Sequence, residues 1–415
     1  MNNQQETKTD TTTEKTPNKK RIRKRIGLLI LAIILIALIS VVGVVAYTFL
    51  FHEPETGVNE PPPFDTSKLN ETTAPETTTE TVEIETSAET LPPETIPETD
   101  PSTLPRGEQK IYNFLFVGQD RVALNTDVIM LISFNTSTNK INILQIPRDT
   151  YIRTKVYSGK INGLYAQYYI KNGKKTPEAL RSMADTLEQS LCIKIHNVGH
   201  INLNGVVAIV DALGGVDVNI PVSYKYIDVD TKQTVTVPAG LQHLDGIKAE
   251  HFIRTRSIYT QADIGRIDAQ KLFVSAFIKK LKSNFTVSTI ANFVDIAFKY
   301  IKTDVSLTDA VFYGKQLLDV DLEQINMMSM IGRATSGDGI SYYVMVRKNM
   351  REMINTYFNI YDFEITDSIF DSERIYTNTT NFSHFNSIYT IQNISTTDPH
   401  NANDLNNDSI YIPHV

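Results

Sequence analysis

Three arginines stand close together in the stretch HFIRTRSIYTQADIGRIDAQ at residues 251–270, namely Arg254, Arg256 and Arg266. In an extended chain, residues two apart point to the same side, so the first two guanidinium groups could reach one ligand. They could equally form the solvent-facing side of an edge strand. Guanidinium groups beside a helix start suit phosphate oxygens, because forked donors and the helix dipole act together. Three arginines indicate a ligand with two phosphates.

Two further polar residues belong to the same stretch. Asp263, Arg266 and Gln270 are spaced i, i+3, i+7, which places them on one side of the helix that begins here. Gln270 is also in line with Phe273 and Phe277, on the face expected to be apolar. A buried amide costs free energy unless it is hydrogen-bonded, so Gln270 is a candidate member of the polar site.

A pair of aspartates forms the second candidate cluster. The apolar run IYNFLFVGQD ends at Asp120, and Asp127 opens the next apolar run. Two carboxylates at adjoining strand ends can share one divalent cation, and a set of oxygen ligands suits Mg²⁺. Asp is also a favoured turn residue, and for two isolated aspartates this is the simpler explanation.

Two basic residues are open to more than one interpretation. Arg148 follows an apolar run in IPRDT, where it could meet the same ligand or pair with Asp149. Lys160 in KINGLYA is similarly ambiguous. The single cysteine, Cys192, excludes an intrachain disulfide, and its apolar neighbours favour a buried, unreactive thiol.

The elements that would position these residues follow from the apolar pattern. Short β-rich runs predict strands of one sheet at 111–117, 127–134 and 140–147, and further strand-like runs lie at 216–222 and 322–331. Apolar residues at helical spacing predict helices at 176–191, 203–213, 267–281, 288–301, 306–318 and 347–357. Because strands and helices alternate, we expect an α/β fold with a central mixed β-sheet flanked by helices on both faces.

The flanking segments have different compositions. Residues 27–51 carry no charge and would form about 37 Å of helix, enough to cross a hydrocarbon core of about 30 Å as an uncleaved transmembrane signal anchor. The basic tail at 1–26 is expected in the cytoplasm, which puts the rest outside the membrane. The Thr/Glu/Pro-rich stretch 52–106, which carries the acidic excess, is expected to be a disordered stalk. A catalytic domain is expected at 107–360, followed by a polar, poorly ordered tail at 361–415.

Six segments, taken in order, resemble the LytR-CpsA-Psr family of bacterial cell-envelope proteins. They are FLFVGQDR with TDVIMLISFN, ILQIPRDTYI, KINGLYA, GVVAIVDALGGVDV, AGLQHLDGIKAEHFIRTR and ADIGRIDAQ, within residues 111–281. The resemblance implies a sheet and helices that enclose an apolar channel for a polyprenyl chain. It also implies a single-pass protein of a Gram-positive-type cell membrane, with its C-terminal domain extracellular.

The activity implied by the resemblance is a phosphotransfer. A glycopolymer phosphate would move from an undecaprenyl-pyrophosphate carrier to peptidoglycan as a phosphodiester, with Mg²⁺ or Mn²⁺ as cofactor. By motif position, Asp120 and Asp127 would hold the metal. Asp263 would act near the acceptor hydroxyl, as base or as orienter of an arginine, with Arg254 and Arg256 as its catalytic partners. The pyrophosphate would be bound by Arg148, Lys160, Arg254, Arg256, Arg266 and Gln270.

The chain departs from the family pattern in three places. Ala269 precedes Gln270 where many members have arginine, so one positive contact is missing or supplied elsewhere. The interval between Asp120 and Asp127 is shorter than in many members, which affects the loop and the metal geometry. Gln145 replaces a frequent serine, and we expect no consequence from this exchange.

Three other functions compete with transfer. The first is a regulatory, transcriptional attenuator-type protein, although a cytoplasmic tail of residues 1–26 leaves no room for a helix-turn-helix, so no nucleic-acid partner is expected. The second is a non-catalytic polyprenyl-lipid-binding envelope protein. The third is a polyprenyl pyrophosphatase, in which water replaces the sugar hydroxyl. The sequence does not distinguish teichoic acid from capsule or another wall polymer.

Overall fold

The structure is a computed structural model, and its folded unit begins at Pro54. It describes residues 52–67, 104–120, 124–154, 156–229, 231–255, 263–284, 286–337, 340–370, 377–378 and 389–390. The expected transmembrane segment 27–51 and the expected cytoplasmic tail 1–26 lie outside these residues. Within the described ranges, no helix combines the length and the apolar character that a membrane crossing requires.

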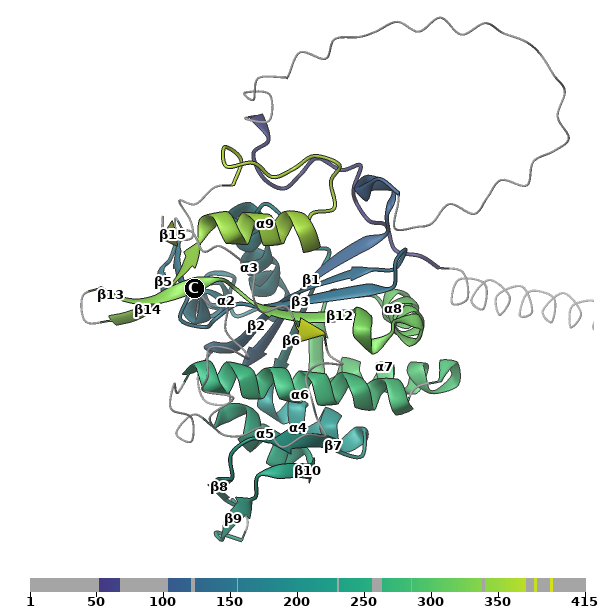
Figure 1. The fold of residues 1–415 in the computed structure, drawn as a ribbon, viewed down its shortest axis with the longest axis vertical. Coiled ribbons are helices and arrows are strands. Elements are labelled where there is room, and N and C mark those ends of the chain that lie inside the picture. The colour runs from purple at the N-terminus through teal and green to yellow at the C-terminus, as the bar shows by residue number, and fades with distance from the viewer. Residues whose placement is uncertain are drawn as a thin grey trace, which may run out of the picture. The chain divides into compact units, whose positions relative to one another are not determined.

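A seven-stranded mixed sheet forms the centre of the fold, in the order β11-β6-β1-β2-β3-β12-β16 (Figure 1). Its strands are β1 (Ile111–Gln119), β2 (Thr126–Asn135), β3 (Lys140–Gln145), β6 (Asn197–Asn202), β11 (Ile301–Thr303), β12 (Ile325–Ser329) and β16 (Tyr389–Thr390). Strands β1, β2 and β3 form an antiparallel meander, whereas β6 runs parallel to β1 and β12 parallel to β3. The expected mixed central sheet is confirmed.

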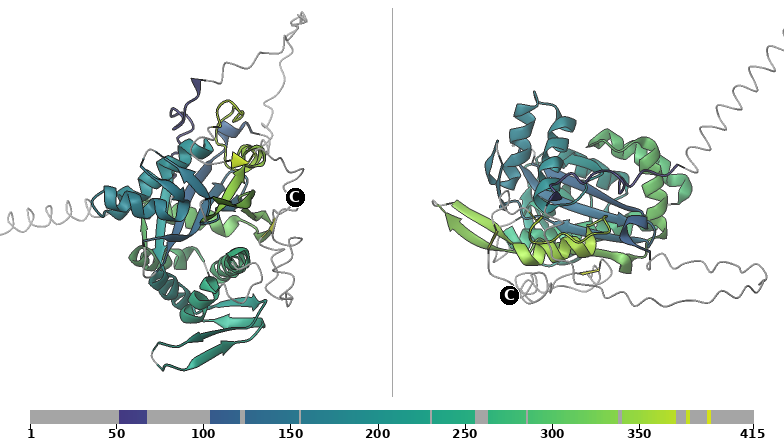
Figure 2. Two further views of the ribbon diagram at one scale, coloured as in Figure 1. Left: turned by 90° about the vertical axis from the view of Figure 1, so that its left-hand side faces the viewer. Right: turned by 90° about the horizontal axis from the view of Figure 1, so that it is seen from above.

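Helices cover both faces of this sheet (Figures 1 and 2). The helices are α2 (Leu164–Lys171), α3 (Thr176–Leu191), α4 (Leu203–Ala212), α5 (Gly246–Arg254), α6 (Asp263–Asn284), α7 (Val287–Tyr300), α8 (Leu307–Asp319) and α9 (Arg347–Tyr357). Side chains alternate along β1, so Leu115 and Val117 pack in a core with α2, α3 and α9, whereas Phe114 and Phe116 pack in a second core with α4, α5 and α6. This two-sided burial explains the nearly continuous apolar runs of the strands.

Smaller elements complete the fold. They are the β-pairs β4 (Tyr151–Arg153) with β5 (Ser158–Lys160), β7 (Val216–Ile220) with β10 (Gly240–Leu244), and β8 (Tyr224–Ile227) with β9 (Thr234–Val237), the strands β13 (Gly332–Gly337), β14 (Ile340–Val346) and β15 (Thr377–Asn378), and the 3₁₀ turns η3 (Arg106–Glu108), η4 (Ile161–Gly163) and η5 (Leu322–Gln324). The predicted helices, and the predicted strands at 111–117, 127–134, 140–147 and 322–331, agree with the structure to within a few residues. The predicted strand at 216–222 forms β7, which pairs with β10 outside the central sheet. The sequence did not indicate β6, α2 or α5.

Local capping determines where the site-forming helices begin. The Asn202 side chain accepts a hydrogen bond from Gly205 N at 2.9 Å, which caps α4 directly after β6. Asp245 caps α5 in the same way, by accepting from Lys248 N at 2.9 Å. Such caps satisfy amide groups that have no partner within the helix. Helix α4 ends at Ala212, and Gly214 follows shortly after it with a positive φ of 73°, which suits glycine.

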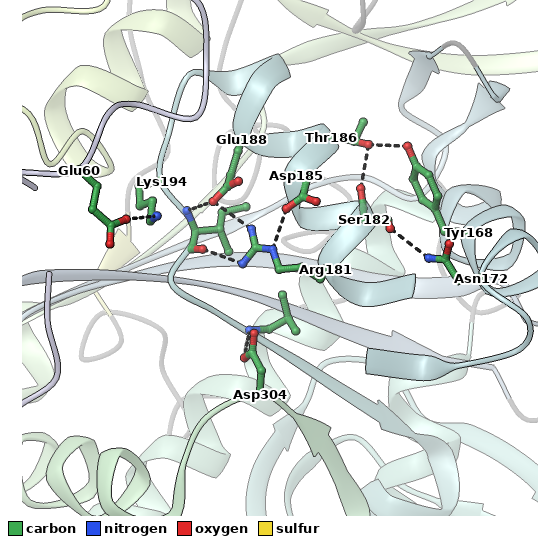
Figure 3. A network of polar contacts seen from close by, with 12 residues as sticks. Glu60, Tyr168, Asn172, Arg181, Ser182, Asp185, Thr186, Glu188, Lys194 and Asp304 are labelled. Carbon is green, nitrogen blue, oxygen red and sulfur yellow. Dashed lines mark hydrogen bonds and ion pairs between the residues drawn. The ribbon is translucent and has the colours of Figure 1, made fainter. Parts of the chain in front are cut away.

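A partly buried ion-pair network attaches α3 to the segment that leads into β6 (Figure 3). Glu188 Oε1 lies 2.9 Å from Arg181 Nη2 and accepts a hydrogen bond from Ile195 N at 2.7 Å. Arg181 Nη1 donates to Ile195 O at 2.9 Å. Burial raises the pKa of Glu188, although Arg181 opposes this shift. The expected buried thiol is confirmed, since Cys192 at the end of α3 is buried.

Two boundary expectations need correction. Residues 54–67 belong to the folded unit and are not part of a disordered stalk, because Phe64 is buried in the core and its ring meets Tyr361 edge-on at 5.8 Å. Tyr112 Oη also donates to Pro54 O at 2.8 Å. The expected polar tail likewise begins too early at residue 361, since Ile369 and Phe370 are buried in the same core. Both corrections have one cause, namely a few apolar residues within a polar surrounding sequence.

Candidate active site

A cavity of about 330 Å³ lies where β1 ends and β2 begins, between the sheet and helices α4, α5 and α6. Its polar lining consists of Gln119, Asp120, Asp127, Asn202, Arg254 and Gln270. Its apolar lining consists of Phe116, Val128, Met130, Ile201, Leu203, Val206, Ile253, Phe273 and Val274. Four residues selected from the sequence for their chemistry therefore share one cavity with an extensive apolar surface.

A β-bulge brings the second aspartate to this cavity. Gly118 pairs with Val128 and Gln119 pairs with Thr126, so Asp127 is the extra residue on β2. Bulges re-aim side chains and are common beside active sites. The turn closes through a hydrogen bond from Asp120 N to Asn125 O at 3.1 Å. Both carboxylates consequently line the same cavity, despite the short interval between them.

The two basic residues of the IPRDT and KINGLYA segments join this carboxylate cluster. Arg148 forms an ion pair with Asp127, and its Nε lies 3.7 Å from Asp149 Oδ1. Lys160 Nζ lies 3.0 Å from the same Asp149 oxygen. Arg148 therefore contacts both carboxylates, and Asp149 links the two cations. All four side chains keep between 19% and 29% of their surface exposed, so the cluster is accessible to a ligand.

Arg254 enters the site in a different way from that expected. It is the last residue of α5 and not part of an extended segment, because the cap at Asp245 starts a helix that continues through Arg254. Its Nη1 lies 3.1 Å from Glu250 Oε1, and its Nη2 lies 3.7 Å from Asp120 Oδ1. Glu250 is almost fully buried, so it holds the guanidinium at the cavity wall.

The remaining site residues are described only in part. Arg256 lies outside the described residues, and the expected convergence of Arg254 and Arg256 stays a prediction. Asp263 and Arg266 lie on the first turns of α6. Only the backbone of these two residues is described, so their predicted roles also stay predictions.

Gln270 has the hydrogen-bond partners that its position on an apolar face requires. It is 4% exposed, and its Oε1 accepts from Gln145 Nε2 at 2.7 Å. Its Nε2 donates to Ile253 O at 3.3 Å, directly before Arg254. The structure therefore gives Gln145 a partner that the sequence did not indicate. This buried residue at the end of β3 connects the sheet, through Gln270, to the end of α5.

Sequence reasoning also missed His200. Its Nε2 lies 2.7 Å from Gln119 Oε1, and its ring stacks on Tyr165 with a centroid distance of 5.2 Å. Burial lowers the pKa of His200 to about 4, so the ring is neutral at pH 7 and Nε2–H donates to Gln119. Its position in HNVGH suggested neither contact, since both partners come from other elements.

The carboxylates of the cavity bear on whether it fits a divalent cation. Within the described part of the chain, no three His, Cys, Asp or Glu side chains are arranged so that they alone could hold a metal ion. Mg²⁺ is commonly held by one or two carboxylates, with water and substrate phosphates completing its shell. Asp120 and Asp127 fit that pattern, because both line one cavity beside arginines that would meet the phosphates.

Such a cavity suits an amphiphilic ligand, with an anionic head beside the ion-paired wall and a chain along the apolar wall. Comparison with known proteins places this α/β domain in one family. The model described as the LytR_cpsA_psr family matches residues 66–359, and the chain belongs to this family.

The pairwise sequence identity to individual relatives is low. The chain is 24% identical over 267 residues to the polyisoprenyl-teichoic acid–peptidoglycan teichoic acid transferase TagV of Bacillus subtilis, covering 60% of this chain and 66% of the relative. It is 30% identical over 233 residues to the transferase of the same kind, TagU, of Bacillus mycoides, covering 55% and 71%. The crystal structure of TagV superposes with a TM-score of 0.51 at 22% identity, covering 59% of this chain and 95% of TagV, which supports the fold.

Proposed function

We propose that this chain is a membrane-anchored, extracellular phosphotransferase that moves a glycopolymer phosphate from a polyprenyl-pyrophosphate carrier to peptidoglycan. The observation that carries the proposal is the single cavity that combines Asp120, Asp127, Arg254 and Gln270 with an extensive apolar lining. The named activities of the two relatives support the same class of reaction. The uncharged segment 27–51 would supply the anchor.

The two parts of the carrier match the two parts of the cavity. The pyrophosphate would lie against Arg254 and Arg148, with Lys160 nearby, because guanidinium forks bind phosphate oxygens in pairs. The polyprenyl chain would lie along apolar side chains such as Phe116 and Phe273. The ion pairs with Asp120 and Asp127 would then be exchanged for contacts with the substrate.

The reaction breaks one phosphorus–oxygen bond and forms another. The acceptor hydroxyl of peptidoglycan would attack the phosphorus that bears the glycopolymer, and polyprenyl phosphate would leave with the bridging oxygen. Asp263 would take the hydroxyl proton or orient an arginine. Arg254 and Arg256 would stabilise the charge on the transferring phosphoryl oxygens, the main requirement in phosphoryl transfer. Mg²⁺ or Mn²⁺ held by Asp120 and Asp127 would neutralise the pyrophosphate.

A reconstituted transfer assay tests this proposal. Full-length protein in detergent would be incubated with Mg²⁺, a polyprenyl-pyrophosphate-linked sugar and peptidoglycan oligomers, and the linked product measured by mass spectrometry. Arg254→Ala should lower kcat about 10²–10³-fold, the usual effect of removing one electrostatic contact to the transition state. Lys299→Ala is the control, because it removes a cation from an exposed pair with Asp295 on α7.

The possible results separate the competing functions. Product that survives the double change Arg254→Ala and Arg256→Ala would overturn the site assignment. Phosphate released without linkage would identify a pyrophosphatase. Binding of the lipid carrier without any turnover would identify a carrier-binding protein.

A further inference from the structure

A second cavity, of about 430 Å³, lies at the other end of the same strands. Its lining residues come from the start of β1, the end of β2, the start of β3, the turn η5 and the end of α9. Its polar lining consists of Arg106, Gln109, Ser133, Asn135, Thr138, Lys140, Asn142, Glu323, Gln324, Asn326, Thr356 and Asn359, and Ile111 and Tyr357 complete it. Most of these are uncharged amides and hydroxyls, in contrast to the apolar lining of the first cavity.

Ser133, Asn142 and Asn326 of this lining continue a polar row that crosses the sheet in register from Asn113, which lies outside the lining. Asn113 on β1 faces Ser133 on β2, Ser133 faces Asn142 on β3, and Asn142 faces Asn326 on β12. The first three side chains are buried, where polar groups cost free energy unless they are bonded. Core positions of a sheet are normally apolar, so a polar row that leads into a cavity suggests a polar ligand.

Two side chains of the row can still form hydrogen bonds with a ligand in the cavity. Asn326 Nδ2 donates to Asn142 Oδ1 at 2.8 Å. Among the described residues, this bond leaves the Asn142 amino group as a donor and the Asn326 carbonyl as an acceptor. The Thr138 hydroxyl, also in the lining, is buried without a hydrogen-bond partner among those residues. An adjacent donor and acceptor match two neighbouring hydroxyl groups, because each hydroxyl both donates and accepts.

The small number of charged side chains and the shape of the cavity favour a neutral ligand. Arg106, Lys140 and Glu323 are the charged residues of the lining, with a net charge of +1, and the other lining residues are uncharged. The half-buried ring of Tyr357 supplies an apolar wall. The volume is that of an ordinary small-ligand site.

We propose that this second cavity is a carbohydrate-binding site for neutral, hydroxyl-rich sugar units. The two cavities lie on opposite faces of the sheet, since Met130 of the first lining packs in the core with α4, α5 and α6 and Ile111 of the second packs in the core with α2, α3 and α9. Along β2, Met130 and Ser133 of the second lining are roughly 10 Å apart at about 3.3 Å per residue. One sugar unit cannot occupy both cavities. Within the proposed function, the second cavity would hold a distant part of a glycan strand, but sugar binding itself requires neither carrier nor metal.

Saturation-transfer NMR on the full-length protein in detergent tests this proposal, with β-1,4-linked N-acetylglucosamine tetramer as the probe and inorganic phosphate as the anionic comparison. Two variants address the lining. Gln324→Glu adds a carboxylate beside Glu323, and Thr138→Val removes the hydroxyl while keeping its shape. Gln233→Glu, on the exposed turn between β8 and β9, is the matched control for charge.

We expect the tetramer to bind and each lining variant to weaken it about ten-fold, the effect of losing about one hydrogen bond. Gln233→Glu should bind as the unaltered chain does. Thr138→Val should leave the midpoint of thermal unfolding unchanged or raised, which excludes damage to the fold. Tetramer binding that both variants leave unchanged would overturn the proposal, as would no tetramer binding or phosphate binding in its place. None of these results depends on transfer activity, which the preceding assay measures separately.

Discussion

At the scale of single residues, the candidate site depends on polar side chains that position one another through hydrogen bonds and ion pairs. Gln145 donates to Gln270, and Gln270 donates to the carbonyl of Ile253, next to Arg254. Glu250 holds the same arginine from within α5. Such supporting contacts fix the guanidinium before a ligand arrives, which lowers the cost of binding.

Gln145→Leu should therefore destabilise the fold and loosen Arg254. The change leaves the buried Gln270 Oε1 without this donor, and such a loss typically costs about 1–3 kcal/mol. The free energy of unfolding from urea titration measures the cost. Gln167→Leu on α2, where the side chain is only half-buried, is the control and should change it by less than about 0.5 kcal/mol. Equal effects of the two changes would contradict a specific role for Gln145.

His200 should make the stability dependent on pH. Its pKa in the folded chain is about 4, below its ordinary value, because burial disfavours the charged ring. The unfolded chain therefore takes up the proton first. The contribution of the neutral ring is present above pH 6.5 and is lost as the pH falls through 4, on the order of 3 kcal/mol in total.

Urea titrations at several pH values between 4 and 7 measure this slope. His200→Gln keeps a group that can donate to Gln119 but cannot be protonated in this range, so the slope should become shallower. His243→Gln changes an exposed histidine and serves as the control. A slope that His200→Gln leaves unchanged would show that other groups cause it.

At the scale of elements, the sequence predicted the position of several strands and helices but neither their pairing register nor β6, α2 and α5. The apolar runs at 111–117 and 127–134 located β1 and β2, but nothing in them indicated that Asp127 is the extra residue of a bulge. Pairing register depends on the partner strand, which local pattern does not contain. Helix α5 was not predicted, since the alternation of Arg254 and Arg256 suggested an extended segment there.

The same limit explains which site residues could be found. Asp120, Asp127, Arg148, Lys160, Arg254 and Gln270 stood out because their residue types are unusual beside apolar runs. Gln145 and His200 did not, because their partners lie on other elements, 125 and 81 residues away in the chain. The family resemblance supplied roles for the first set and none for these two.

At the scale of the whole molecule, residues 54–67 form part of the same fold as the central sheet, whose first strand begins at Ile111. Phe64→Ala should test this contribution, because it removes a buried ring that meets Tyr361 edge-on. We expect the free energy of unfolding to fall by about 2–4 kcal/mol.

Thermal and urea unfolding measure the effect of Phe64→Ala. The control is Ile227→Ala on β8, where the side chain is 65% exposed and its removal should cost less than about 0.5 kcal/mol. A cost for Phe64→Ala as small as that of the control would mean that residues 54–67 add little to stability.

The two outermost strands of the central sheet are its shortest, since β11 has three residues and β16 has two. A long, flat outermost strand offers a row of unpaired amide and carbonyl groups onto which another chain can add. Short terminal strands offer few such groups. A protein that works in a crowded layer outside the cell, as proposed, would thereby be protected from stacking into fibres through its own backbone.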